Sequence, residues 1–177
     1  VRRQRQMCIR DRQGTFANVL ADFHLKEGHE KYLKVFRPAK VPHGIKEDVD
    51  TAIDKLNETG IRVDGRNLLV ASQVVPVVTH KDGKRKVRVC INYKNTINSH
   101  IEDESYPFPT CNEQLDKLKG EYYSTVDLDG AYTQVPVGKG GHLLTYVTSD
   151  GYIQPTRLPF GVKTCLLYTS DAADERN

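Results

Sequence analysis

The chain has 177 residues, of which 38% are hydrophobic and 28% are charged, and its formal net charge is +3. Residues 1–12 carry five Arg and one Asp, and residues 165–177 carry three acidic side chains and one Arg, so the charge without these ends is +1. The overall charge therefore does not by itself indicate a nucleic-acid partner. No apolar run approaches the roughly 20 residues of a membrane span. We expect an intracellular, cytoplasmic protein without a membrane partner.

The two ends are predicted to derive from a DNA sequencing adapter. Residues 165–175 can be back-translated into a DNA string whose reverse complement, read one base out of register, encodes residues 2–11. That string resembles the mosaic end of transposase-based library kits. We therefore assign residues 1–12 and 165–177 to adapter sequence and residues 13–164 to the protein. The alternative is a basic N-terminal arm with an acidic tail.

The four cysteines do not form a metal-binding pattern. Cys8 and Cys165 lie in the predicted adapter segments, and Cys90 and Cys111 show neither a CxxC pair nor another metal-ligand spacing. Reduced structural thiols are the expected state of such cysteines in an intracellular protein.

The first predicted elements are a helix followed by a hairpin. Residues 41–60 carry apolar side chains at every third or fourth position, which predicts an amphipathic helix with Gly60 as its C-cap. Residues 74–78 and 86–93 are predicted strands. The Asp-Gly pair in the turn 80–85 between them favours a hairpin.

The remaining predicted elements are a helix, a strand and a second hairpin. Residues 104–110 contain two prolines and are not expected to be helical, whereas residues 111–120 predict a short helix ended by glycine. Strands are then predicted at 122–128, 143–148 and 152–158, with a turn at 149–151. This order predicts an α+β fold with a mainly antiparallel sheet and helices.

Three features point to chemistry on phosphates. Asp127 lies towards the end of an apolar strand, where a buried carboxylate needs a compensating positive charge such as a divalent metal. An edge-strand Asp facing water is the alternative. Residues 81–94 carry six cations against one Asp, which suggests a triphosphate grip or simply a solvated hairpin. Gly161, in the motif RLPFGV, allows a backbone to approach a ligand closely.

Five blocks of the sequence, in the same order and at similar spacing, resemble the reverse transcriptases of gypsy-type long-terminal-repeat retrotransposons. The blocks are VASQVVPVV, HKDGKRKVRVCINYKNTIN, YPFPTCNEQLDKLKG, YYSTVDLDGAYTQVPV and GYIQPTRLPFGV. The resemblance covers about residues 25–164. It implies a partial right-hand polymerase fold, comprising the fingers and the first part of the palm.

The resemblance also implies a role for Asp127 as the first catalytic aspartate of the palm. With the carbonyl of Leu128, it would ligate two Mg²⁺ ions that activate a primer 3′ hydroxyl and neutralise triphosphate charge. Tyr132 matches the steric-gate aromatic that distinguishes deoxyribose from ribose.

Four further residues would bind the incoming nucleotide. Arg88 and Lys81 match residues that hold the triphosphate, and Phe160 and Gly161 match the segment that closes over the nucleotide. The implied partners are deoxynucleotides, an RNA or DNA template with its primer, and the remaining Pol segments: the rest of the palm, the thumb, RNase H, integrase and protease.

The sequence departs from the family pattern at several positions. Asn92 stands where an aspartate is usual, Val87 where tryptophan is frequent, and Gln73 where proline is common. Lys84 is an alternative to Lys81 as phosphate ligand, because the hairpin is slightly longer than in the family. The Tyr-X-Asp-Asp turn with the other two catalytic aspartates is missing, since the sequence contains no Asp-Asp pair.

The chain by itself is therefore expected to be an inactive fragment of an RNA-directed DNA polymerase. The alternative is a non-catalytic nucleic-acid-binding remnant of a retroelement, which grips a template-primer through its basic hairpin. A metal-dependent nuclease or an unrelated phosphotransferase would need a second acidic cluster near Asp127. Asp129 would share a face with Asp127 only if the strand continues.

Overall fold

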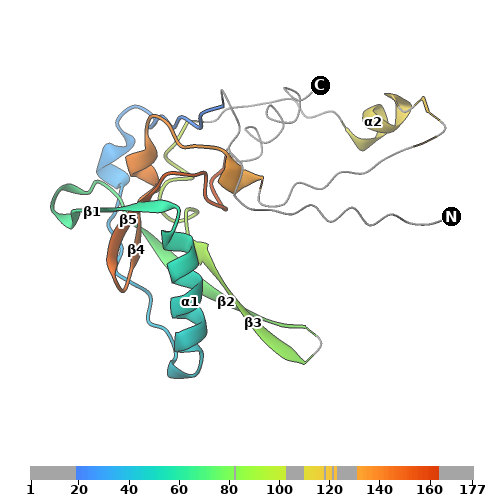
Figure 1. Ribbon diagram of the computed structural model, residues 1–177. Helices are drawn as coiled ribbons and strands as arrows, with labels where there is room; N and C mark the ends of the chain where they lie inside the picture. Colours follow the sequence, from blue (N-terminus) through green and yellow to red (C-terminus); the bar gives the residue numbers. More distant parts are fainter. Residues whose placement is uncertain are drawn as a thin grey trace.

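The computed structural model describes residues 19–81, 83–102, 110–117, 119–120, 122 and 131–163. The helices and strands follow one another in the order α1, β1, β2, β3, α2, β4, β5 (Figure 1). Their bounds are α1 Lys46–Asn57, β1 Gly60–Val63, β2 Ser72–Lys81, β3 Lys84–Ile91, α2 Cys111–Lys117, β4 Tyr146–Thr148 and β5 Gly151–Pro155. Short 3-10 helices lie at His29–Tyr32, His43–Ile45, Gly65–Asn67, Tyr132–Gln134 and Gly141–Leu144.

The strands form one five-stranded sheet in the order β1-β5-β4-β2-β3. The pairs β1/β5, β5/β4 and β2/β3 are antiparallel, and β2 runs parallel to β4 through Ser72 and Gln73. The prediction of an α+β protein with a mainly antiparallel sheet is confirmed. Beyond Gln73, β2 leaves β4 and continues with β3 as a hairpin that projects from the sheet beside α1 (Figure 1).

Helix α1 lies within the predicted segment but ends earlier. It buries Val49 and Ile53, which lie one turn apart on the same face, as the apolar spacing predicted. The helix ends at Asn57, and Gly60 is the first residue of β1. A Cβ atom at Gly60 would collide with the side chain of Ile153 on β5. Gly60 therefore permits close strand pairing, and its prediction as a helix cap was wrong.

The predicted β2–β3 hairpin is present, and its two strands run further towards the turn than predicted. His80 pairs with Arg85 and Lys81 with Lys84, so residues that were predicted as turn belong to the strands. Gly83 has a φ of +71°, a conformation that glycine adopts without steric cost. The second strand ends at Ile91 and does not reach Tyr93, whose backbone N–H turns back to the Ile91 carbonyl.

The second hairpin differs from its prediction in both strands. Residues Gly141–Leu144 form a 3-10 helix, so β4 begins only at Tyr146. Leu143 and Leu144 are both buried, and the Leu143 N–H closes the 3-10 turn by donating to the Gly140 carbonyl at 2.9 Å. Strand β5 ends at Pro155, short of the predicted 158.

Helix α2 begins with a reciprocal pair of caps. The Thr110 backbone N–H donates to Glu113 Oε2 at 2.6 Å, and the Glu113 N–H donates to Thr110 Oγ1 at 3.3 Å. The helix ends at Lys117, three residues before the predicted glycine stop. Of the predicted non-helical segment 104–110 and the predicted strand 122–128, residues 104–109 and 123–128 lie outside the described residues.

The hydrophobic core lies between α1, the sheet and the turn that follows β3. Tyr93, Ile97 and Ile101 from that turn are almost fully buried with Leu143, Leu144 and Tyr146. Burial raises the pKa of Tyr93 well above its ordinary value, and the neighbouring Tyr146 adds to the shift. The Tyr93 hydroxyl therefore stays protonated and donates to the Leu144 carbonyl at 2.8 Å. No helix in the described part of the chain is long and apolar enough to cross a membrane.

Candidate functional site

The basic residues of the hairpin are divided between its two faces. Arg88 lies opposite Val77, and Lys86 lies opposite Thr79, so all four share one side of the pair. Arg88 and Lys86 are both exposed. This side of the hairpin therefore presents two neighbouring cations to solvent, as a site for phosphate requires.

Arg85, from the same basic run, points to the other face and has a structural contact. Its guanidinium forms an ion pair with Asp48 of α1 at 2.7 Å and donates to the Gly44 carbonyl at 2.9 Å. Arg85 thus ties the hairpin to the start of α1. The side chain of Lys81, the other predicted phosphate ligand, and that of Lys84 lie outside the described part of the structure.

Tyr132 and Phe160, predicted to serve one nucleotide site, are brought into contact. Their ring centroids are 5.1 Å apart with an interplanar angle of 79°, an edge-to-face arrangement that aromatic pairs favour. Tyr132 is partly buried against the core, whereas the Phe160 side chain is 57% exposed. More than half of the Phe160 surface is therefore open to a ligand while its ring contacts Tyr132.

A short antiparallel contact holds the segments of these two rings together. The Leu158 N–H donates to the Val135 carbonyl at 2.9 Å, and the Val137 N–H donates to the Thr156 carbonyl at 3.0 Å. Arg157 adds a bond from its guanidinium to the Gln134 carbonyl at 3.3 Å. These bonds join chain segments about twenty residues apart and fix where Tyr132 and Phe160 meet.

Gly161 places the loop after Phe160 against the end of β3. It has a φ of +95°, which strongly favours glycine, and a Cβ atom there would lie 3.4 Å from the Ile91 carbonyl oxygen. The close backbone approach that the sequence suggested is thus an approach to β3 itself. Arg88 lies three residues before Ile91, about 10 Å along an extended strand.

A cavity of about 180 Å³ lies beside Phe160, and Tyr132 is not part of its lining. Its lining includes Phe160, Leu158 and Thr133, together with Cys90 at the end of β3 and Leu56 near the end of α1. A hollow next to an exposed aromatic ring suits a planar ligand group.

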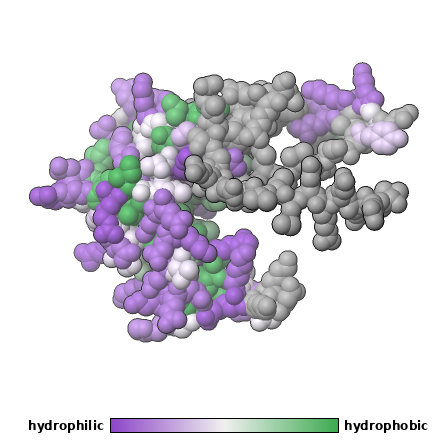
Figure 2. All heavy atoms as spheres, viewed as in Figure 1, coloured by the Kyte–Doolittle hydropathy of each residue, from purple (hydrophilic) through white to green (hydrophobic). Residues whose placement is uncertain are grey.

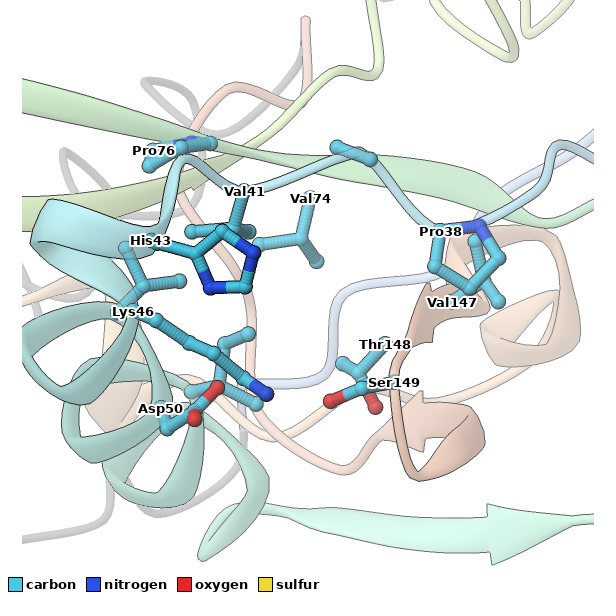
Figure 3. Close-up of a pocket in the computed structure, with 13 residues that line it drawn as sticks. Pro38, Val41, His43, Lys46, Asp50, Val74, Pro76, Val147, Thr148 and Ser149 are labelled. Carbon is cyan, nitrogen blue, oxygen red and sulfur yellow. The ribbon is translucent and has the colours of Figure 1, made fainter.

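A second cavity, of about 220 Å³, is lined by the earlier turns of α1 and contains none of the predicted site residues. In Figure 3 the side chains of Lys46 and Asp50 point towards it from α1, opposite Thr148 and Ser149. Its floor is apolar, with Val74 among the residues there. Figure 2 shows that the viewed face over α1 is mostly hydrophilic.

The predicted metal ligands cannot be placed. Asp127 and Leu128 lie outside the described residues, which resume at Ala131. Within the part of the chain that the structure describes, no three His, Cys, Asp or Glu side chains gather as a metal site would require.

Two departures from the family pattern have local structural roles. The Asn92 side-chain oxygen accepts from the Asn95 N–H at 3.4 Å, and so caps the turn after β3. The Gln73 side chain donates to the Arg37 carbonyl at 3.1 Å. Sequence reasoning also missed Asn98, whose side-chain amide reaches the loop after Phe160. Its only signal was a polar side chain within a block already assigned to the family.

Comparison with known proteins identifies relatives that match most of this chain. No protein-family model matches the chain. An uncharacterised protein of Caenorhabditis elegans is 33% identical over 158 residues, covering 88% of this chain. A retrovirus-related Pol polyprotein from transposon 412 of Drosophila melanogaster is 30% identical over 147 residues, covering 78% of it. The chain spans only 12% and 11% of the lengths of these two relatives.

Solved structures of a foamy virus protease-reverse transcriptase have a fold similar to that of this chain. The crystal structure of the prototype foamy virus protease-reverse transcriptase matches with a TM-score of 0.68 at 20% identity, over 92% of this chain and 21% of that one. The foamy viral protein in complex with an RNA/DNA hybrid matches with a TM-score of 0.63 at 19% identity, over 91% and 20%. The chain is thus a homologue of one segment of retrotransposon and retroviral Pol polyproteins, and its fold is that of a reverse transcriptase-like protein.

Proposed function

We propose that this chain forms the fingers and the first part of the palm of an RNA-directed DNA polymerase, which adds deoxynucleotides to a primer on a nucleic-acid template. The observation that carries the proposal is the edge-to-face contact between Tyr132 and Phe160, held against the end of β3 by Gly161. The pair of aromatic rings, of which Phe160 lines a cavity, and the exposed cations further along β3 suit a base, a sugar and a triphosphate. The rest of the palm and the thumb would come from other Pol segments.

In this proposal, different residues of the chain bind different parts of the nucleotide. Arg88 binds triphosphate oxygens, for which a guanidinium is suited because it can donate two parallel hydrogen bonds. Lys81 is the second proposed phosphate ligand. Tyr132 packs under the deoxyribose and excludes a 2′ hydroxyl, while Phe160 and Gly161 close over the base.

Asp127 and the Leu128 carbonyl are the proposed ligands of two Mg²⁺ ions. Carboxylate and carbonyl oxygens are the donors that this hard cation prefers. When bound, the ions would lower the charge on the triphosphate and favour loss of the primer hydroxyl proton. Because the sequence supplies only the first of the three family aspartates, the chain alone is expected to lack polymerase activity.

The test uses the complete Pol product, expressed from source DNA that extends the reading frame through the codon of Thr164. Primer extension on an RNA template is expected, and Asp127→Asn should lower its rate by at least about 10³-fold. Tyr132→Ala should relax the preference for deoxynucleotides over ribonucleotides by about tenfold or more. Asp150→Asn, in the exposed β4–β5 turn, is the control and should leave the rate unchanged. Full activity of Asp127→Asn would refute the proposal.

A second candidate is nucleic-acid binding without catalysis, which the exposed pair Lys86 and Arg88 favours. Phosphate neutralisation by a few cations is enough for such binding, and its affinity falls steeply with salt. Binding of a template-primer by the chain, together with no extension by the complete Pol product, would favour this candidate over the polymerase.

A further inference from the structure

The side chain of Asn98 links the turn after β3 to the loop that carries Phe160. Asn98 Nδ2 donates to the Gly161 carbonyl at 2.8 Å, and Asn98 Oδ1 accepts from the Lys163 N–H at 3.1 Å. One side chain thus satisfies an acceptor and a donor two residues apart on a segment more than sixty positions away in the chain. Both ends of the amide are used, so the orientation of the side chain is fixed.

Asn98 stands on a rigid base. Its backbone N–H donates to the Tyr93 carbonyl at 3.0 Å, and the preceding residue, Ile97, is fully buried. Tyr93 is itself 1% exposed and bonded through its hydroxyl to the Leu144 carbonyl. The turn that presents Asn98 is therefore anchored in the core.

The loop that Asn98 holds is also anchored at two neighbouring points. Val162 is 2% exposed in the core, and the Leu158 N–H, just before Phe160, donates to the Val135 carbonyl. Phe160 is 57% exposed, and the ring contact that the structure describes for it is the one with Tyr132. Gly161 is in the left-handed region, and a Cβ atom there would lie 3.4 Å from the Ile91 carbonyl oxygen at the end of β3. The two amide bonds connect Gly161 and Lys163, on either side of the buried Val162, to the core-anchored turn.

We propose that Asn98 is a positioning residue that holds the loop 160–163 so that Phe160 meets Tyr132, and that it thereby sets nucleotide affinity. The role in nucleotide binding rests on the proposed polymerase function. The clamp itself does not, because it is a property of the folded chain. Asn98 touches no reacting atom, so its loss should weaken the binding of the nucleotide more than it slows the chemical step.

The clamp is tested on the 177-residue chain by amide hydrogen exchange and by NMR contacts between the two rings. Asn98→Ala should speed exchange at the Lys163 N–H by about two- to tenfold, the range expected for one lost hydrogen bond. It should also weaken the Tyr132–Phe160 ring contacts. Asn98→Asp retains an acceptor for the Lys163 N–H but loses the donor to Gly161, so it should keep Lys163 protected while the ring contacts weaken.

Asn95→Ala is the matched control, because Asn95 lies in the same turn and its side chain is exposed. It should change neither the exchange rate nor the ring contacts. Thermal melts of all variants separate loss of the clamp from loss of the fold. If Asn98→Ala and Asn98→Asp both leave Lys163 exchange and the ring contacts as in the unaltered chain, the inference is wrong.

The functional part is tested by nucleotide kinetics in the complete Pol product. Asn98→Ala should raise the KM for deoxynucleotide by about five- to tenfold and lower kcat by less. Asn95→Ala should leave both constants unchanged. A loss of about five- to tenfold in kcat with an unchanged KM would overturn the positioning role, and the polymerase proposal would still stand. Absence of extension by the unaltered Pol product would instead refute the polymerase proposal, and the exchange experiment would still decide the clamp.

Discussion

Strand β2 belongs to two regions with different environments, the body of the sheet and the hairpin that projects from it. Ser72 and Val74, at its beginning, are 0% and 5% exposed, whereas Val77 is 42% exposed. Valines occur in both parts of the strand, and valine favours strands in either place. The difference shows that strand propensity forms the element, and that the packing partners decide which part of it is core and which is available for binding.

The hairpin itself repeats this division across its two faces. The face with Arg85 is tied to α1, and the face with Lys86 and Arg88 is exposed. Because side chains alternate along a strand, one basic run supplies both an internal ion pair and an exposed cationic surface. The charge of the run therefore overstates the number of cations available to a ligand.

The largest expected effect is on the free energy of unfolding. It is measured by comparing a substitution at Ile91, which is 7% exposed at the base of β3, with one at Val77 on the exposed face. Ile91→Ala should lower the free energy of unfolding by about 2–4 kcal/mol, because a cavity remains in the core. Val77→Ala should lower it by less than about 1 kcal/mol, since solvent already reaches the side chain. Urea unfolding of the two variants measures both values. Similar losses for both would mean that the projecting hairpin is packed as tightly as the body.

The second effect concerns nucleic-acid binding by the exposed face. Arg88→Ala should weaken binding of the chain to a template-primer by about three- to tenfold and reduce the salt slope of log K by about 1. Fluorescence anisotropy at several salt concentrations measures both quantities. Arg85→Ala removes the same charge from the opposite face and is the matched control, with a smaller expected effect. Equal effects of the two variants would contradict the division of faces.

The third effect is the coupling between Arg85 and Asp48. Both side chains are nearly half exposed, at 45% and 47%, so water and salt weaken their attraction. A double-mutant cycle with Arg85→Ala and Asp48→Ala should give about 0.2–1 kcal/mol of coupling, less at high salt. A coupling of zero at low salt would show that Arg85 holds α1 only through the Gly44 carbonyl.

The smallest effect lies in the body, at His100. Burial lowers the pKa of His100, and His29 and Lys26 lower it further; its Nδ1 lies 3.2 Å from Nδ1 of His29. The contribution of His100 to stability is present above its ordinary pKa of 6.5 and is lost as the pH falls through the lowered pKa of the folded state. Urea unfolding between pH 5 and 7.5 should show this loss, and His100→Asn should reduce it. An unchanged pH dependence in that variant would assign the effect to another group.

Much of the fold follows from local sequence patterns. The apolar spacing of α1 and the Asp-Gly turn of the first hairpin predicted those elements, because the interactions that form them lie within a few residues. Local pattern failed where the neighbour was distant. Gly60 was assigned to the helix because its close approach to Ile153 on β5 is not visible in the sequence around it.

The candidate site shows the same limit. The family blocks indicated Arg88, Tyr132 and Phe160 as binding residues, but only the folded chain brings Tyr132 to Phe160 across 28 positions and splits Arg85 from Arg88. Asn98 carried no signal that separated it from the other polar residues of its turn.

The sequence by itself thus predicted helix α1, the β2–β3 hairpin, the α+β class and the relationship to retroelement Pol proteins, whereas strand β1 and the 3-10 helix Gly141–Leu144 were not predicted. Tertiary structure alone decided which cations are used internally, which aromatic rings meet, and which amide holds the loop beside them. The reason is physical. Helical hydrogen bonds, tight turns and the alternation of side chains along a strand act between residues that are close in the chain, whereas these contacts join segments tens of residues apart and depend on how the core packs.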